Sequence, residues 1–248
     1  TIGILTDPFS NKHMGVTAER VAERYNVSRE QQDEFALESQ RRANTAAAKA
    51  AFAEEITPVQ TIARKPVTVD TDEHPRPETT MEDLAALRPA FEAGGSVTAG
   101  NASGVNDGAA AVVVTRATTA LEQGLGALAT IEHVTTAALE PEIMGYAPVL
   151  ALQKLFEQSG LTPADIDVFE VNEAFASQAV AVIVHINSPG GTTAGSEQLY
   201  ALGHPVGATG TILTLRAAMD LQRRDLEYAV VTMCIGGGQA LAALLRRA

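Results

Sequence analysis

The sequence predicts an α/β protein in which helices cover a central sheet, and three patterns along the chain lead to this prediction. The second half alternates short β-branched runs with helical segments of about a dozen residues. The first third is rich in helix signals, and a segment dense in Gly, Asn, Ser and Asp, residues 94–108, closes it. We therefore expect two regions, a mostly helical one at residues 1–108 and a sheet-containing one at residues 109–248.

The helices of the first region are predicted from residues that cap helix ends. Thr17 can begin a helix that ends near Asn26. Ser28 with Gln31 forms a capping box, which opens a longer helix through an alanine run to about Phe52. Two start signals so close together predict a helical hairpin.

After this hairpin the pattern becomes less regular. Residues 56–69 alternate like a strand, and residues 72–77 form a polar loop rich in proline. Thr80 with Asp83 marks a further helix start. We interpret this stretch as an excursion from the sheet core.

Beyond residue 108 strands and helices alternate. The predicted strands are residues 109–115, 129–136, 167–171, 228–234 and 239–245, and the predicted helices are residues 147–159, 173–182 and 208–223. This alternation is typical of a layered domain in which a sheet is covered by helices.

Composition and charge argue against several classes of function. The chain has 248 residues, 46% hydrophobic and 19% charged, which is ordinary for a globular protein. The formal net charge of -12 disfavours non-specific binding to nucleic acid or to an anionic membrane surface. No apolar run reaches the roughly 18 residues of a membrane span, and no secretory leader is visible near Thr1.

Cysteine usage bears on compartment and metal binding. Cys234 is the single cysteine, so an internal disulfide framework is excluded, and no Cys/His spacing matches a zinc site. We therefore expect a reducing, cytoplasmic compartment and no metal site.

Three motifs of the second region put reactive side chains beside glycines at predicted strand ends. They are Asn172-Glu173-Ala174-Phe175, Gly203-His204-Pro205 and Cys234-Ile235-Gly236-Gly237-Gly238. Sites in open α/β sheets gather at the carboxyl ends of strands. Singly, each motif has an ordinary explanation: a buried cysteine, a structural histidine, an asparagine that caps a helix. Together they supply a proton donor, an oxyanion donor and a water holder for acyl chemistry.

At these motifs the chain resembles the thiolase family, the acyl-CoA C-acyltransferases that make or split 3-oxoacyl-CoA. The resemblance covers most of the chain from about Thr6 and continues, in the family's order, through HMGVTAE at residues 13–19, RPAF at residues 88–91 and VTAGNASG at residues 97–104. It implies a thiolase-like layered fold. Residues 1–108 would be the loop domain that covers coenzyme A, and residues 109–248 the end of the N-terminal core sheet followed by the C-terminal domain.

The resemblance also implies catalytic roles. His204 would donate a hydrogen bond to the thioester oxygen, with a water held by Asn172 as the second donor. Cys234 would move the proton at the substrate's α carbon, and the backbone N–H of Gly236 would stabilise the oxyanion of the tetrahedral intermediate. A cysteine thiolate beside a glycine-rich turn and a histidine is a reasonable base.

The substrate is implied as coenzyme A and its acyl thioesters, with no covalently bound cofactor. For its binding the resemblance points to Arg76 at the adenine, Ser103 at the pantetheine, Met14 and Phe175 at the acyl group, and His13 nearby. Arg76 and Ser103 also have ordinary explanations, a solvated loop cation and a turn residue. The resemblance further implies a homodimer or homotetramer, and His13-Met14-Gly15 favours the short-chain biosynthetic type.

Two departures from the family pattern limit these expectations. The family's nucleophilic cysteine lies ahead of the position of Thr1, and this sequence has no second cysteine. We expect either part of a longer chain or an incomplete thiolase-like fragment that binds coenzyme A or a partner. Residues 183–200 also read unlike the family, and Asn-Ser-Pro-Gly-Gly at residues 187–191 resembles an oxyanion-hole segment of serine peptidases. The chain lacks a GxSxG elbow, so a serine peptidase is disfavoured.

Overall fold

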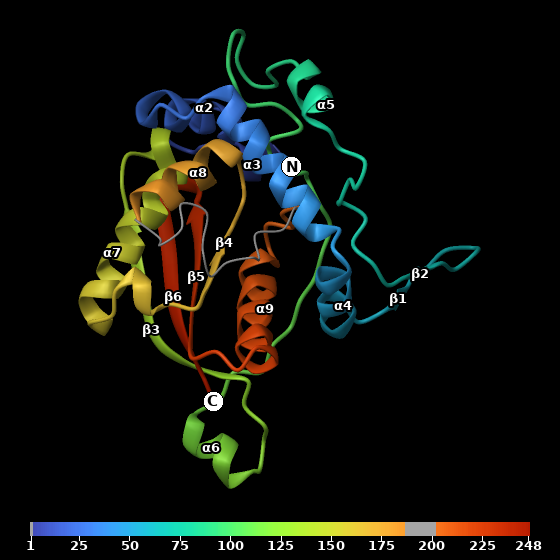
Figure 1. Ribbon diagram of the computed structural model, residues 1–248, viewed down its shortest axis with the longest axis vertical. Helices are drawn as coiled ribbons and strands as arrows, with labels where there is room; N and C mark the ends of the chain where they lie inside the picture. Colours follow the sequence, from blue (N-terminus) through green and yellow to red (C-terminus); the bar gives the residue numbers. More distant parts are fainter. Residues whose placement is uncertain (1, 187–201) are drawn as a thin grey trace.

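A computed structural model describes residues 2–186 and 202–248, which form a layered α/β fold with helices on both faces of a mixed sheet (Figure 1). The sheet has the order β3-β6-β5-β4, with bounds Ala129–Ala138, Gln239–Arg247, Tyr228–Ile235 and Val168–Val171. β6 runs antiparallel to both of its neighbours, whereas β4 and β5 are parallel. The carboxyl ends of β4 and β5 therefore meet at one edge of the sheet, where a site is expected.

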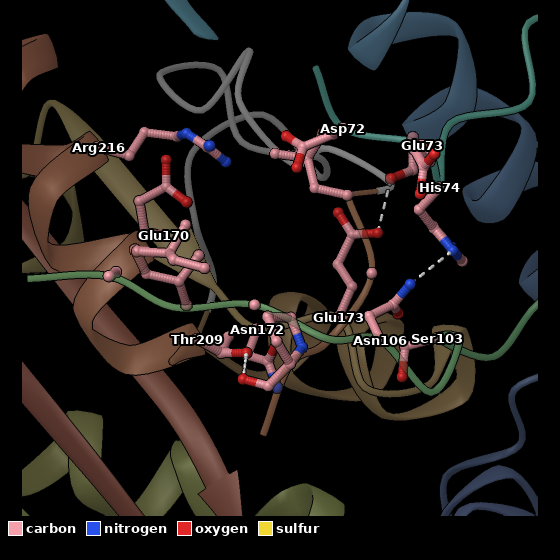
Figure 2. A pocket seen from close by; sticks show the side chains of 18 of the residues that line it. Asp72, Glu73, His74, Ser103, Asn106, Glu170, Asn172, Glu173, Thr209 and Arg216 are labelled. Atoms are coloured by element: carbon pink, nitrogen blue, oxygen red, sulfur yellow. Dashed lines mark hydrogen bonds between the residues drawn. The ribbon is translucent and has the colours of Figure 1, made fainter. Parts of the chain in front are cut away.

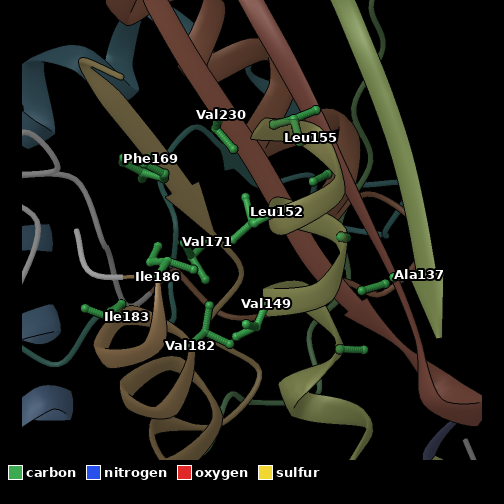
Figure 3. Packing of buried hydrophobic residues seen from close by; sticks show 14 of the residues in the cluster. Ala137, Val149, Leu152, Leu155, Phe169, Val171, Val182, Ile183, Ile186 and Val230 are labelled. Atoms are coloured by element: carbon green, nitrogen blue, oxygen red, sulfur yellow. The ribbon is translucent and has the colours of Figure 1, made fainter. Parts of the chain in front are cut away.

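Helices cover the sheet because alternate strand residues point to opposite faces. One face packs against α7 (Ala147–Ser159) and α8 (Ala176–His185), where Leu152, Phe169 and Val171 belong to the largest buried cluster (Figure 3). The other face packs against α9 (Thr209–Arg223) through a second cluster that includes Val168. β4 is buried on both faces, and its sequence Val-Phe-Glu-Val is apolar except for Glu170.

The first region adds helices beside this sheet domain. They are α1 (Ile2–Leu5), α2 (Met14–Tyr25), α3 (Arg29–Ala43), α4 (Ala46–Glu55) and α5 (Met81–Ala86), with a short hairpin of β1 (Val59–Gln60) and β2 (Thr68–Val69). α2 and α3 pack against α8, and the hairpin projects from the body (Figure 1). The remaining elements are α6 (Ala117–Glu122) and the 3₁₀ turns η1 (Pro141–Tyr146), η2 (Pro163–Asp165) and η3 (Gly236–Gly238).

The capping residues show which helix predictions are confirmed. Both hydrogen bonds of the Ser28–Gln31 box are present at the start of α3, and the Thr80 box opens α5 as predicted. The single helix predicted to run to Phe52 is wrong, because α3 ends at Ala43 and Thr45 caps a separate helix α4.

The predicted start of the first helix at Thr17 is also wrong. α2 begins at Met14, and His13 is its N-cap, with Nδ1 accepting from the Gly15 N–H at 3.0 Å. The Thr17 hydroxyl instead donates to Met14 O at 2.7 Å, inside the first turn. The predicted helix at residues 173–182 begins later as well, at Ala176, because Phe175 is extended and forms an isolated bridge with Ala102.

The strand predicted at residues 109–115 is the clearest error. Within the described part of the chain these residues pair with no strand, and the side chains of Val113 and Val114 are 91% and 72% exposed. β-branched residues fit a strand only where a neighbouring strand and a packed face are available, and residues 2–186 and 202–248 offer this segment neither. The other predicted strands of the second region and its helices are confirmed to within a few residues. The division at residue 108 stays a prediction.

No helix among the described residues has the length and apolar character needed to cross a bilayer.

Candidate functional site

The three sequence motifs converge at the carboxyl edge of β4 and β5. Asn172 follows β4, and its N–H donates to Thr232 O of β5 at 3.0 Å. The glycine-rich loop of the first region joins them through isolated bridges from Ala102 to Phe175 and from Val105 to His204. The sheet edge, the Gly203–Pro205 loop and the glycine-rich loop therefore build one site.

A cavity of about 860 Å³ opens beside this edge, and both regions of the chain line it (Figure 2). Asn172 and Glu173 contribute from the end of β4, Ser103 from the glycine-rich loop, and Asp72 and His74 from the loop after the hairpin. Its size is within the range of cofactor and small-molecule sites.

Hydrogen bonds at both ring nitrogens hold His204. Nδ1 lies 2.7 Å from the Thr209 hydroxyl, and that hydroxyl donates to Pro205 O at 3.0 Å. Because a hydroxyl has one proton to give, it must accept from the His204 Nδ1–H. Nε2 then carries a lone pair toward Asn172 Nδ2, 3.4 Å away. Burial lowers the pKa of His204, so its neutral form with the proton on Nδ1 is favoured.

Cys234 lies in an apolar environment near the end of β5. Its buried side chain belongs to a cluster with Met14, Phe175, Ala174 and three further residues, Ala18, Val97 and Met144. Burial raises the pKa of the Cys234 thiol to about 12, so the group is protonated at neutral pH. The resting thiolate that the sequence suggested is therefore not what this environment favours.

The residues expected around the acyl group surround this thiol. The ring of His13 stacks on Phe91 with centroids 4.9 Å apart, and Phe91 meets Phe175 edge-on at 6.0 Å. A Cβ added at Gly236 would lie 3.0 Å from the Met14 methyl, so the glycine turn passes directly beside Met14. Met14, Phe175, Gly236 and Cys234 are thus brought together, and their roles stay predictions.

The two residues expected at coenzyme A lie in different settings. Ser103 lines the cavity, and its N–H donates to Ala174 O at 3.0 Å. Arg76 is exposed; its N–H donates to Gln40 Oε1 at 2.7 Å and its guanidinium to Glu73 O at 3.2 Å. Arg76 does not line the cavity, although His74 close by in the chain does.

Two carboxylates in the cavity wall, the partly buried Glu173 and the buried Glu170, were missed by sequence reasoning. Glu173 accepts from the Ser39 hydroxyl at 2.6 Å, and burial raises the pKa of its carboxyl to about 7. Glu170 is 2% exposed, its pKa is raised well above the usual range by burial, and Oε1 has no hydrogen-bond partner among the described residues. Glu173 stood inside a quoted motif, but spacing alone does not show that a glutamate is buried.

Two other sequence hypotheses concern the peptidase-like segment and metal binding. The peptidase-like segment Asn187 to Gly191 lies outside residues 2–186 and 202–248, so the structure says nothing of it. Within those ranges, no group of three or more His, Cys, Asp or Glu side chains could hold a metal ion.

Comparison with known families gives a consistent assignment along nearly the whole chain. Residues 2–118 match the family model described as thiolase, N-terminal domain, and residues 125–247 match thiolase, C-terminal domain. The beta-ketothiolase BktB of Cupriavidus necator is 48% identical over 99% of this chain and 63% of its own length. An acetyl-CoA acetyltransferase of Escherichia coli is 46% identical over 95% of this chain and 60% of its own length.

Solved structures agree with these sequence matches. The acetyl-CoA acetyltransferase of Bacillus anthracis superposes with a TM-score of 0.92 at 40% identity, covering 100% of this chain and 63% of the other. Human mitochondrial 3-ketoacyl-CoA thiolase gives a TM-score of 0.93 at 38% identity over the same shares. The chain spans less than two thirds of the length of these relatives.

Proposed function

Because this chain belongs to the thiolase family, we propose that it acts in acyl-CoA C-acyl transfer. The reaction is Claisen condensation of acetyl-CoA to acetoacetyl-CoA or thiolytic cleavage of a 3-oxoacyl-CoA. One observation carries the proposal: His204, which contacts Asn172 after β4, and Cys234 near the end of β5 lie at the same end of the sheet, and burial shifts their pKa values in opposite directions. Pairs of titratable groups whose environments separate their pKa values are typical of acid–base sites.

The proposed chemistry assigns the α proton of the thioester to Cys234. The C–H electron pair moves into the enolate, the proton passes to the Cys234 sulfur, and the negative charge develops on the thioester oxygen. Donors aimed at that oxygen stabilise the charge. His204 Nε2 and a water held by Asn172 are the proposed donors, and the Gly236 N–H serves the later tetrahedral oxyanion.

The proposed step requires particular protonation states of Cys234 and His204. Cys234 accepts a proton only as a thiolate, and His204 donates from Nε2 only after that nitrogen has gained a proton. Moving one proton from the cysteine to the histidine satisfies both needs without changing the total number of bound protons. We propose this exchanged form as the reactive one. It is a minor species in equilibrium with the neutral pair, because burial disfavours the charge on each group.

The finer expectations belong to the same proposal. Coenzyme A thioesters are the substrates, with Ser103, Arg76, Met14, His13 and Phe175 as candidate contacts and no covalently bound cofactor. A short acyl chain, a role in fatty acid metabolism, a cytoplasmic location and a homodimer or homotetramer are inferred from the family resemblance. Arg76 with Arg64 and Lys65 could offset the net charge of -12 for an anionic ligand.

A second candidate function is binding of coenzyme A without turnover. It is favoured by one observation: the sequence has no cysteine besides Cys234, so the covalent acyl step finds no second thiol in this chain.

Deuterium exchange at the methyl group of acetyl-CoA tests the proposal, because enolisation needs no acyl-enzyme. We expect exchange catalysed by the protein in deuterated buffer, and its loss in Cys234→Ala. Met233→Leu, which changes the neighbouring side chain on β5, is the matched control. Coenzyme A binding without exchange in the unmodified protein would reject the proposal in favour of the binding function.

A further inference from the structure

Asn106 contacts the loop that carries His204, and the proposed reaction assigns it no task. Its side-chain Oδ1 accepts a hydrogen bond from the backbone N–H of His204 at 3.0 Å. The residue before it, Val105, forms a parallel bridge with His204. The two segments are separated by about a hundred residues of chain, so this contact joins the glycine-rich loop to the histidine loop.

The same amide packs against the glycine that precedes His204. Gly203 has φ +84°, a conformation that residues with a Cβ rarely adopt. A Cβ added there would lie 2.2 Å from Asn106 Oδ1. The backbone therefore approaches the amide as closely as only a glycine allows, and the two residues fix where the loop turns toward the site.

The orientation of the Asn106 amide follows from its partners. Oδ1 is used by the His204 N–H, so Nδ2 points to His74 Nδ1, 3.4 Å away (Figure 2). An amide nitrogen only donates, so that ring nitrogen must carry a lone pair. Burial, followed by the charge of Arg76, lowers the pKa of His74, while Asp72 opposes this shift. The neutral histidine fits the acceptor role.

We propose that Asn106 is a positioning residue for His204: its amide clamps the Gly203–His204 backbone, so that the ring stays between Thr209 and Asn172. The amide touches the backbone of His204 and neither ring nitrogen, so it acts through the histidine. The clamp itself is independent of the reaction, whereas its catalytic consequence rests on the proposed function.

Hydrogen exchange at the His204 amide tests the clamp without any activity measurement. We expect Asn106→Ala to speed exchange of this N–H by about tenfold, the loss that one hydrogen bond implies. Asn44→Ala is the matched control, because Asn44 is also half-buried and its Nδ2 donates to a backbone oxygen, Gln40 O, at 2.8 Å. Asn106→Asp keeps an acceptor for the N–H and should retain protection.

The outcomes separate the clamp from the proposed function. Unchanged exchange of the His204 amide in Asn106→Ala overturns the clamp, whatever the activity. If that variant does not fold, Asn106→Ser, whose hydroxyl is too short to reach the N–H, replaces it under the same criterion. Where acetyl-CoA exchange is catalysed, we expect Asn106→Ala to lower kcat with KM nearly unchanged and Asn106→Asp to restore part of the rate. Fast amide exchange with an unaltered kcat would overturn the positioning role and leave the proposed function standing.

Discussion

The site has two halves that differ in chemistry. The polar half consists of His204 with Asn172 and Thr209, each of which hydrogen-bonds to one of its ring nitrogens. The apolar half consists of Cys234, Met14 and Phe175, which pack together. Burial acts on both, yet it lowers the pKa of His204 and raises that of Cys234, because it disfavours the charged form of each group. The comparison teaches that one physical cause, burial, keeps both groups neutral, the histidine as a base and the cysteine as an acid.

The largest expected effect comes from removing the imidazole of the polar half. His204→Ala should slow acetyl-CoA proton exchange by about 10²–10³-fold, or roughly 2.7–4 kcal/mol, the usual loss for one oxyanion donor. Exchange rates at saturating acetyl-CoA measure this effect. His133→Ala, which removes a half-buried histidine of β3, is the control. A near-normal rate in the His204 variant would remove the polar half from the mechanism.

Glu173, next to Asn172 in the chain, tests whether burial raises the pKa of a carboxyl group beside the polar half. Its pKa is about 7 in the folded protein against 4.5 for an ordinary glutamate carboxyl, so folding disfavours its charge. Below pH 4.5 Glu173 is protonated in both the folded and the unfolded state. Between pH 4.5 and pH 7 its ionisation lowers the free energy of unfolding progressively, by about 3 kcal/mol in total. Glu173→Gln should therefore gain up to this free energy of unfolding between pH 4 and pH 8.

Urea unfolding at the two pH values, with the exposed Glu157→Gln as control, measures this gain. Equal stability differences at both values would mean that Glu173 titrates normally.

The Thr209 hydroxyl offers a smaller test of the polar half. Thr209→Val removes the acceptor for the His204 Nδ1–H while it keeps the side-chain shape, and leaving a buried donor unpaired costs about 1–3 kcal/mol. We expect kcat for proton exchange to fall roughly tenfold to a hundredfold, and Thr209→Ser to restore it. Loss of activity in the serine variant as well would point to packing of the methyl group.

The smallest expected change is in the pH profile. If the reactive form differs from the neutral pair only by one proton moved from Cys234 to His204, its fraction is constant between the two pKa values. The exchange rate should then be flat from about pH 7 to 9. A tenfold rise per pH unit would instead identify a thiolate that acts alone, and the two halves would no longer be coupled.

Local signals predicted much of the fold because they depend on neighbours in the chain. Ser28 and Gln31 satisfy each other's backbone groups, and the same holds for Thr80 and Asp83, so both helix starts could be read from four residues. His13 escaped because a ring nitrogen is a rare cap. The break between α3 and α4 was hidden by the alanine run that follows Thr45, although Thr45 itself is a good cap.

The candidate site was predictable in part, through its motifs. Neither Asn106 nor Thr209 was singled out, because their contacts with His204 depend on how loops meet. Protonation was the harder problem: the thiol of Cys234 stands beside glycines in sequence, but Met14 and Phe175, distant in the chain, set its environment. Tertiary burial of this kind leaves no local pattern.

Residues 109–115 and β3 carry similar strand signals, yet only β3 pairs within the described residues, with β6. The unpaired segment bears three consecutive valines, residues 112–114, that are 41%, 91% and 72% exposed. Backbone N–H and C=O groups without a strand partner, next to such exposed apolar side chains, are a template for pairing with another chain. We therefore expect residues 112–114 to promote aggregation of the purified chain at high concentration. Val113→Lys places a charge in this segment and should raise the protein concentration at which turbidity appears.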